Sequence, residues 1–149
     1  MAIDYGARNV GVAVTDELLL TARPLTTIRR EKLKYAQVIE RVRELAAENE
    51  IATLVVGLPL NMDGTRGPAV ERVESFISDL RQDLSIPIVT VDERLTSHEA
   101  DQVLREMGIS LRERRARSDE YAATIILQDY IDGQRRQPPS DNSSSAPSQ

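Results

Sequence analysis

A change of hydrophobic period along the chain constrains the fold more than any other sequence feature. Short apolar runs separated by turn residues occupy residues 2–28, a pattern typical of strands. From Tyr35 to Ala47 the apolar residues recur at helical spacing, and the apolar run Thr53–Gly57 that follows is typical of a buried parallel strand. A hairpin that leads into a strand–helix–strand crossover produces a mixed sheet, so the sequence predicts an α/β protein with helices on both faces.

Five strands and four helices are expected, with Gly6 and Asn9 in the turn between the first two strands. The strands are expected at Ala2–Tyr5, Val10–Val14, Leu20–Ile28, Thr53–Gly57 and Ile88–Val91. The helices are expected at Tyr35–Ala47, Val70–Leu84, Thr96–Met107 and Ser118–Gly133. These elements form one domain over residues 1–133. Residues 134–149 are rich in Pro, Ser and Asn and are expected to form a disordered polar tail.

The composition narrows the chemistry that the chain can perform. Hydrophobic residues make up 40% and charged residues 29%, as in a soluble globular protein. The chain has no cysteine and a single histidine, His98, which excludes thiolate chemistry and the usual zinc sites. His98 itself is expected to face solvent on a helix. A metal would be bound by oxygen ligands, which favours Mg²⁺ or Mn²⁺.

The charge and hydropathy indicate where the protein works. No signal peptide and no stretch long enough to span a membrane is visible, so we expect a cytoplasmic protein. The net charge of −5 weighs against binding to nucleic acid, although two basic groups stand out locally. The first group is Arg29, Arg30, Lys32 and Lys34, and the second is Arg112, Arg114, Arg115 and Arg117.

Three carboxylates on different elements are candidates for catalysis. Asp4 lies inside an apolar strand, where an uncompensated charge is costly, and Glu93 follows the strand Ile88–Val91, where sites gather. Asp119 lies in the first turn of the last helix. Each acid also has an ordinary structural interpretation: a turn aspartate, part of a polar loop in which Arg94 pairs with a carboxylate, and an acid that stabilises a helix N-terminus. Together they suit two hard cations that hydrolyse a phosphodiester bond.

The loop Gly57–Thr65 also follows a strand, and its backbone N–H groups or the side chains of Asn61 and Thr65 could contact a phosphate. An ordinary turn-rich connection explains the same loop. We further expect the second basic group to steer phosphates toward the acids.

At these residues the chain resembles the YqgF family, the RuvX-like pre-16S rRNA nucleases, which are ribonuclease H-fold relatives of Holliday junction resolvases. The resemblance extends over about Met1 to Gly133. It rests on five segments: Ile3–Gly6 with Gly11–Val14, Thr21–Leu25, Val56–Thr65, Asp92–Ser97, and Asp119 with Ala122–Ala123. Two features depart from the family pattern. Fewer residues than usual precede Asp4, and Ala7 stands where the family often has threonine.

The resemblance implies a ribonuclease H-like fold with a mixed five-stranded sheet and an acidic triad of Asp4, Glu93 and Asp119. It implies dependence on Mg²⁺ or Mn²⁺ and a precursor ribosomal RNA substrate, cut near the mature 16S 5′ end. Arg94, Asn61 and Thr65 match family positions close to the site and are expected to bind substrate.

Three other functions fit parts of the pattern. The Asp-x-Gly hairpin also occurs in sugar-kinase and actin-like ATPases, but those proteins need two such domains with a nucleotide between them. A non-catalytic RNA-binding or transcription-associated module would keep the fold and cut nothing. A Holliday junction resolvase would use the same chemistry and normally needs a symmetric dimer. The sequence indicates a monomer or a weak homodimer and no membrane partner.

Overall fold

The computed structural model describes residues 1–94, 102 and 105–136, and its centre is one five-stranded sheet. The strands lie in the order β3-β2-β1-β4-β5, with β2 antiparallel to both of its neighbours and β1, β4 and β5 parallel. Their bounds are β1 Ala2–Tyr5, β2 Asn9–Thr15, β3 Ala22–Arg29, β4 Leu54–Leu58 and β5 Ile88–Asp92. This mixed sheet confirms the predicted α/β architecture.

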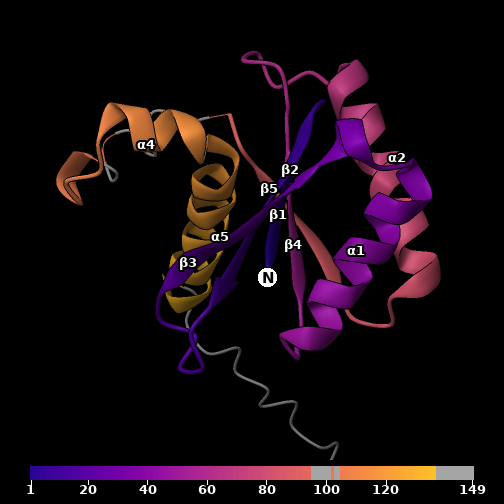
Figure 1. Ribbon diagram of the computed structural model, residues 1–149, viewed down its shortest axis with the longest axis horizontal. Helices are drawn as coiled ribbons and strands as arrows, with labels where there is room; N and C mark the ends of the chain where they lie inside the picture. The colour runs from indigo at the N-terminus through magenta and orange to yellow at the C-terminus, as the bar shows by residue number, and fades with distance from the viewer. Residues whose placement is uncertain (95–101, 103–104, 137–149) are drawn as a thin grey trace, which may run out of the picture.

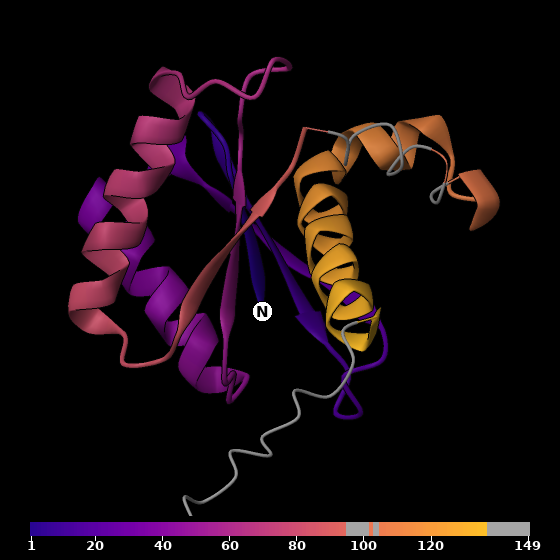
Figure 2. The ribbon, with the colours of Figure 1, turned by 180° about the vertical axis from the view of Figure 1, so that it is seen from behind.

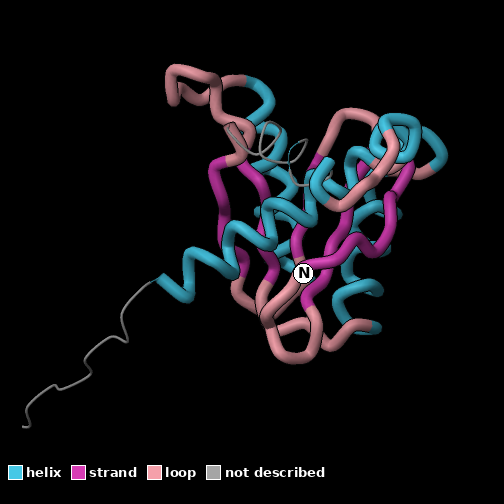
Figure 3. The backbone as a smooth tube through the Cα atoms, turned by 90° about the vertical axis from the view of Figure 1, so that its left-hand side faces the viewer, coloured by secondary structure: helices cyan, strands magenta, loops and turns pink. Residues whose placement is uncertain are grey.

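Helices cover both faces of the sheet (Figure 1). Two helices lie on one face and α5 lies on the other, and the view from behind in Figure 2 shows the same three layers. The loops gather at the two ends of the strands (Figure 3). The helices are α1 Tyr35–Glu48, α2 Pro68–Asp83, α4 Leu111–Ala116 and α5 Ser118–Arg136, with a short 3₁₀ helix η1 at Arg30–Lys32.

Alternation along the strands separates two cores of different character. On β1, Ile3 faces α1 and α2 and joins a core of large side chains that includes Phe76, while Ala2 faces α5. The α5 side is built partly from the small residues Ala2, Ala13 and Ala123, all fully buried. Because small side chains allow close approach, α5 can lie near the strand backbones.

The helices differ from the prediction in one missing helix and in several bounds: α1 ends one residue later than predicted, and α2 begins at Pro68 and ends at Asp83. The six-residue helix α4 was not predicted, because its mostly charged sequence has no apolar period. Helix α5 was predicted to end at Gly133 but runs to Arg136, so residues 134–136, assigned to the tail, are helical. A glycine ends a helix by taking a positive φ, and Gly133 does not, whereas Gly108 does with φ 74°.

The strand predictions need small shifts. Strand β3 begins at Ala22 rather than at Leu20, and β4 and β5 each end one residue later than predicted. The helix predicted over 96–107, with His98, lies largely outside the described residues, although residues 102, 105 and 106 are helical. Within the described part of the chain, no helix is both long and apolar enough to cross a bilayer.

Candidate active site

Asp4 lies at the carboxyl end of the central strand β1, next to Gly11 of β2. The two residues are directly paired in the antiparallel register. A Cβ atom on Gly11 would lie 1.9 Å from the backbone oxygen of Asp119, a distance that no packed side chain tolerates. The missing side chain of Gly11 therefore lets the first turn of α5 rest on β2, which places Asp119 beside Asp4.

A second glycine leaves room on the other side of Asp4. Ile3 pairs with Val56 of β4, so the next step of this parallel register brings Asp4 beside Gly57. A Cβ atom on Gly57 would lie 2.3 Å from Oε2 of Glu93, and the Glu93 backbone N–H donates to the oxygen of Leu58 at 3.2 Å. The carboxylate of Glu93 thus occupies the space above Gly57.

The electrostatics show that the three predicted acids share one environment. Burial, followed by the charge of Asp119, raises the pKa of Asp4 to about 6. Burial also raises the pKa of Glu93 to about 7, with further contributions from the charges of Asp4 and Asp92. Asp4 therefore interacts with both other acids and forms the centre of the group.

The start of α5 is held to the sheet by polar contacts that sequence reasoning missed. Asn9 of β2 donates from Nδ2 to Oδ2 of Asp119 at 3.1 Å. Thr27 of β3 donates to Glu120 at 3.0 Å, and Arg117 donates to the other oxygen of Glu120 at 2.8 Å. The spacing of three between Arg117 and Glu120 could have been found in the sequence, but the contacts of Asn9 and Thr27 require the register of the strands.

The loop after β4 is internally bonded and lies against the segment after β5. Asn61 donates from Nδ2 to the hydroxyl of Thr65 at 2.9 Å, and this hydroxyl donates to Asp63 at 2.6 Å. A Cβ on Gly64 would lie 3.2 Å from a guanidinium nitrogen of Arg94. Arg94 therefore lies against the loop that carries the two predicted residues.

Arg94 also forms the ion pair that its ordinary interpretation suggested. Its Nε donates to Oδ2 of Asp92 at 2.8 Å, and its Nη2 lies 2.7 Å from the same oxygen. This hydrogen bond lowers the pKa of Asp92. Arg94 is about one-third exposed, so part of the guanidinium stays accessible to a ligand.

The arginines of the second basic group have different surroundings. Arg112 and Arg115 are exposed on α4, and Arg114 is partly buried. Arg117 pairs with Glu120 and lies over the ring of Tyr121, 5.4 Å from its centroid. Figure 1 shows α4 projecting from the N-terminal end of α5, away from the sheet.

The three acids offer the type of donor atom that a hard divalent cation prefers. All are carboxylate oxygens, and burial and mutual repulsion raise the pKa of two of them, a cost that a bound cation would relieve. As the side chains stand, no three Asp, Glu or His residues within the described residues converge to metal-ligating spacing. Binding a cation would require these side chains to draw together.

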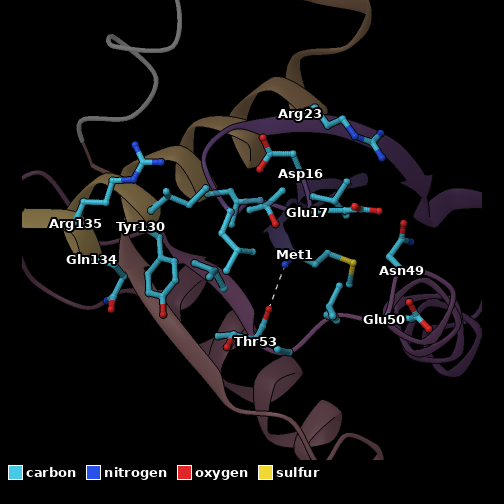
Figure 4. Close-up of a pocket in the computed structure, with 18 residues that line it drawn as sticks. Met1, Asp16, Glu17, Arg23, Asn49, Glu50, Thr53, Tyr130, Gln134 and Arg135 are labelled. Carbon is cyan, nitrogen blue, oxygen red and sulfur yellow. Dashed lines mark hydrogen bonds between the residues drawn. The ribbon is translucent and has the colours of Figure 1, made fainter.

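A cavity of about 850 Å³ lies elsewhere, at the opposite end of β1 (Figure 4). The Met1 amino group points into this region and donates to the oxygen of Thr53 at 3.2 Å, and burial lowers its pKa to about 6. Asp16, Glu17 and Arg23 line the cavity, and none of the three candidate acids does. This cavity and the candidate acids therefore lie at opposite ends of β1.

A mixed five-stranded sheet with helices on both faces gives this chain the ribonuclease H-like fold. The fold is similar to that of T. thermophilus RuvC in complex with a Holliday junction substrate, with a TM-score of 0.58 and 16% identity over 90% of this chain and 94% of that one. It is also similar to the Fowlpox virus resolvase in complex with Holliday junction DNA, with a TM-score of 0.52 and 10% identity over 89% and 95% of the two chains.

The family is shown by sequence. The family described as RuvX, Holliday junction resolvase, matches residues 1–133, and the chain belongs to this RuvX (YqgF) family of nucleases. A relative from Roseiflexus sp. (strain RS-1), named "Putative pre-16S rRNA nuclease", is 44% identical over 91% of this chain and 94% of its own length. A relative of the same name from Anaeromyxobacter sp. (strain K) is 43% identical over 93% of this chain and 98% of its own length. The protein is a hydrolase of the nuclease type, as predicted.

Proposed function

We propose that the chain hydrolyses phosphodiester bonds in the precursor of 16S rRNA, during maturation of its 5′ end, with Asp4, Glu93 and Asp119 as the catalytic and metal-binding residues. The observation that carries the catalytic assignment is the pair of glycines beside Asp4. Gly11 admits the turn that bears Asp119, and Gly57 admits the carboxylate of Glu93. The names of the relatives support the ribosomal substrate.

Two Mg²⁺ or Mn²⁺ ions are the proposed cofactors, since divalent metals are general in nucleases of this fold. Bound between the acids, they would activate the attacking water and stabilise the leaving oxygen. The chain contributes the oxygen ligands and a site in which Asn9 orients Asp119. Because Glu93 has a pKa of about 7, its charge forms fully only above neutral pH or when a cation is near.

Substrate phosphates are proposed to contact the rim of the site. Asn61, Thr65 and Arg94 gather on one side, around the loop after β4. On the other side we assign binding to Arg112, Arg114 and Arg115 on α4. Arg117 contributes charge to the same rim, while its pairing with Glu120 gives it a part in holding α5.

A four-way DNA junction is the second candidate substrate, favoured by the description of the family and by the similarity in fold to RuvC. Paired cuts across a junction need a symmetric dimer. We propose a monomer or weak homodimer that acts in the cytoplasm, and this arrangement suits the RNA substrate better.

Cleavage of two substrates by matched variants tests the proposal. A precursor 16S 5′-end RNA and a four-way DNA junction are incubated with Mg²⁺ or Mn²⁺ and with wild type, Asp4→Asn or Asp129→Asn. Asp129 is an exposed acid of α5 and controls for the change of charge. We expect wild type and Asp129→Asn to cut the RNA and Asp4→Asn to leave it intact. Cleavage of the junction in place of the RNA would move the function to recombination, and RNA cleavage by Asp4→Asn would refute the catalytic assignment.

A further inference from the structure

An open hollow of about 570 Å³ lies on the α1 and α2 side of the sheet, at the same end as the acids. Two tyrosines and two arginines dominate its lining: Tyr5, Tyr35, Arg30 and Arg72. We propose that this hollow binds one unpaired nucleotide of the substrate strand, a few nucleotides from the bond that is cut. The proposal rests on the proposed function, because it places the hollow along the path of a strand held at Asp4.

The position of the hollow follows from the alternation of β1. Tyr5 directly follows Asp4, and the two side chains point to opposite faces of the sheet. Consecutive Cα atoms are about 3.8 Å apart, so a strand that crosses the end of β1 passes from the acids to the hollow within a few nucleotides. Tyr35 and Pro68, the first residues of α1 and α2, also line the hollow.

The walls of the hollow are held in place before any ligand binds. The ring of Tyr5 stacks on Phe76 with centroids 4.1 Å apart, and Arg30 lies over Tyr5 at 4.4 Å. Arg30 also donates to the backbone oxygen of Gly6 at 2.7 Å. The hydroxyl of Tyr35 donates to Asp79 at 2.5 Å. A preformed wall loses little conformational entropy on binding, which favours affinity.

Tyr35 provides the accessible aromatic surface. The residue is 44% exposed although it begins a helix whose other apolar residues are mostly buried. In proteins that bind single strands, such a ring is a platform on which a base stacks, and an arginine guanidinium offers a second planar surface. Tyr35 and Arg30 therefore supply the two kinds of surface that recognise an unpaired base.

The charge inside the hollow suits a base more than a phosphate alone. Arg30 and Arg72 are matched by Glu71 and Asp79 in the same lining, so the formal charges cancel. The adjoining segment 29–34 has a net positive charge, with Arg29, Lys32 and Lys34 exposed beside one exposed acid, Glu31. This arrangement places a base inside and its neighbouring phosphates on the first basic group of the sequence.

The test is a scan of a labelled single-stranded RNA from the precursor 5′ end, and of the same sequence as DNA, in which each nucleotide in turn is replaced by an abasic one. Binding is measured by fluorescence anisotropy, with EDTA present to stop hydrolysis. For wild type, we expect an abasic replacement at one position to weaken binding roughly tenfold, the scale of one base–aromatic stack. In Tyr35→Ala this positional loss should disappear, and Tyr35→Phe should retain it.

A matched pair on one helix separates the hollow from general electrostatics. Arg72 lies in the hollow and Arg81 is exposed in the last turn of the same helix α2, so either alanine substitution removes the same charge. Arg72→Ala should weaken binding severalfold more than Arg81→Ala. If Arg72→Ala loses affinity for both RNA and DNA, the hollow recognises base and phosphate. If the loss is confined to RNA, the hollow also recognises the 2′-hydroxyl.

Other results would overturn the proposal. One is an equal loss of affinity for an abasic nucleotide at every position. Another is a loss at one position that persists in Tyr35→Ala. A third is an equal loss of affinity in Arg72→Ala and Arg81→Ala. The cleavage assay tests the proposed function separately from this binding test. If the RNA binds in a Tyr35-dependent way but is not cut, the hollow stands and the catalytic proposal falls; if the RNA is cut with no dependence on Tyr35, the reverse holds.

Discussion

Asp4 carries a high electrostatic cost at the centre of the site. The side chain is mostly buried on the central strand, and the charge of Asp119 adds to the cost of burial, which together raise its pKa from 3.8 to about 6. A charged Asp4 therefore destabilises the protein unless a cation compensates it. A carboxylate kept at such a position is typical of function rather than of fold stability.

Replacing Asp4 by asparagine should stabilise the metal-free protein at about pH 8, by on the order of 1–3 kcal/mol. The folded state binds the Asp4 proton more tightly than the unfolded state, so stability falls as the pH rises from about 4 to about 6 and stays lower above that range. Asparagine cannot ionise, so its advantage should be complete at about pH 8 and should shrink below about pH 4. Urea unfolding in EDTA at both pH values measures the difference.

The control for this prediction is Asp129→Asn, which removes an exposed carboxylate from α5 and should change stability little at either pH. Added Mg²⁺ should narrow the gap between Asp4→Asn and wild type, because the cation stabilises the wild-type acids. A wild type more stable than Asp4→Asn at about pH 8 in EDTA would contradict the electrostatic account.

Asn9 is predicted to act through Asp119. Its amide donates to that carboxylate at 3.1 Å, so Asn9→Ala should lower the rate of cleavage roughly tenfold and raise the Mn²⁺ concentration needed for half-maximal activity. A purely structural role would lower thermal stability without moving the Mn²⁺ midpoint. Activity titrations with Mn²⁺, together with thermal melts, distinguish the two roles.

At the level of elements, the contact between β2 and the first turn of α5 sets the geometry of the site. The contact depends on Gly11, because any side chain there would collide with the backbone of Asp119. The fully buried Ala123 lies one turn further along and allows the same close packing. A displaced α5 would carry Asp119 away from Asp4.

Gly11→Ala should therefore destabilise the fold by more than about 2 kcal/mol and abolish cleavage, since a backbone segment must move. Gly133→Ala is the matched control, because a Cβ there meets nothing within 4 Å and the residue is helical. It should stabilise α5 by up to about 1 kcal/mol. Denaturant unfolding measures both, and wild-type stability of Gly11→Ala would contradict the packing described.

At the scale of the whole molecule, the net charge of −5 opposes a polyanion, so binding depends on where the cations lie. Arg112 and Arg115 are exposed on α4, near the N-terminal end of α5. Arg135 and Arg136 are in the last turn of α5, at its far end. The same change of charge can thus be made near the site and away from it.

The double substitution Arg112→Ala with Arg115→Ala should weaken binding of RNA and make it less dependent on salt. The logarithmic salt slope should fall by about 0.7 for each phosphate that the variant no longer neutralises. The double substitution Arg135→Ala with Arg136→Ala should leave the slope near that of wild type. Affinity measured over a range of salt concentrations gives both slopes. Equal slopes for the two variants would show that α4 does not bind the nucleic acid.

Hydrophobic period predicted most of this architecture but little of the fine geometry. The helix α1 and the strand β4 were located within one residue at each end, because each has a strong apolar pattern. The charged helix α4 has no such pattern and was missed. The segment 137–149 of the predicted tail lies outside the described residues.

Asp4 could be proposed from the sequence because a carboxylate in an apolar strand is unusual, whereas Glu93 and Asp119 were proposed from their places at element ends and from the resemblance to the YqgF family. Their mutual arrangement could not, since the roles of Gly11 and Gly57 depend on which residues face each other across three strands. The partner of Asn9 likewise lies 110 residues away in the chain. Contacts of this range follow from topology and register, which local sequence patterns do not contain.

The most direct test of the account is a titration of Mn²⁺ followed by electron paramagnetic resonance, because the central claim is that Asp4, Glu93 and Asp119 together bind a divalent cation. Wild type and Asp129→Asn should bind Mn²⁺ with equal affinity, and Asp4→Asn should bind it at least tenfold more weakly, since it removes the central ligand and its charge. Equal binding of Mn²⁺ by wild type and Asp4→Asn would contradict the claim.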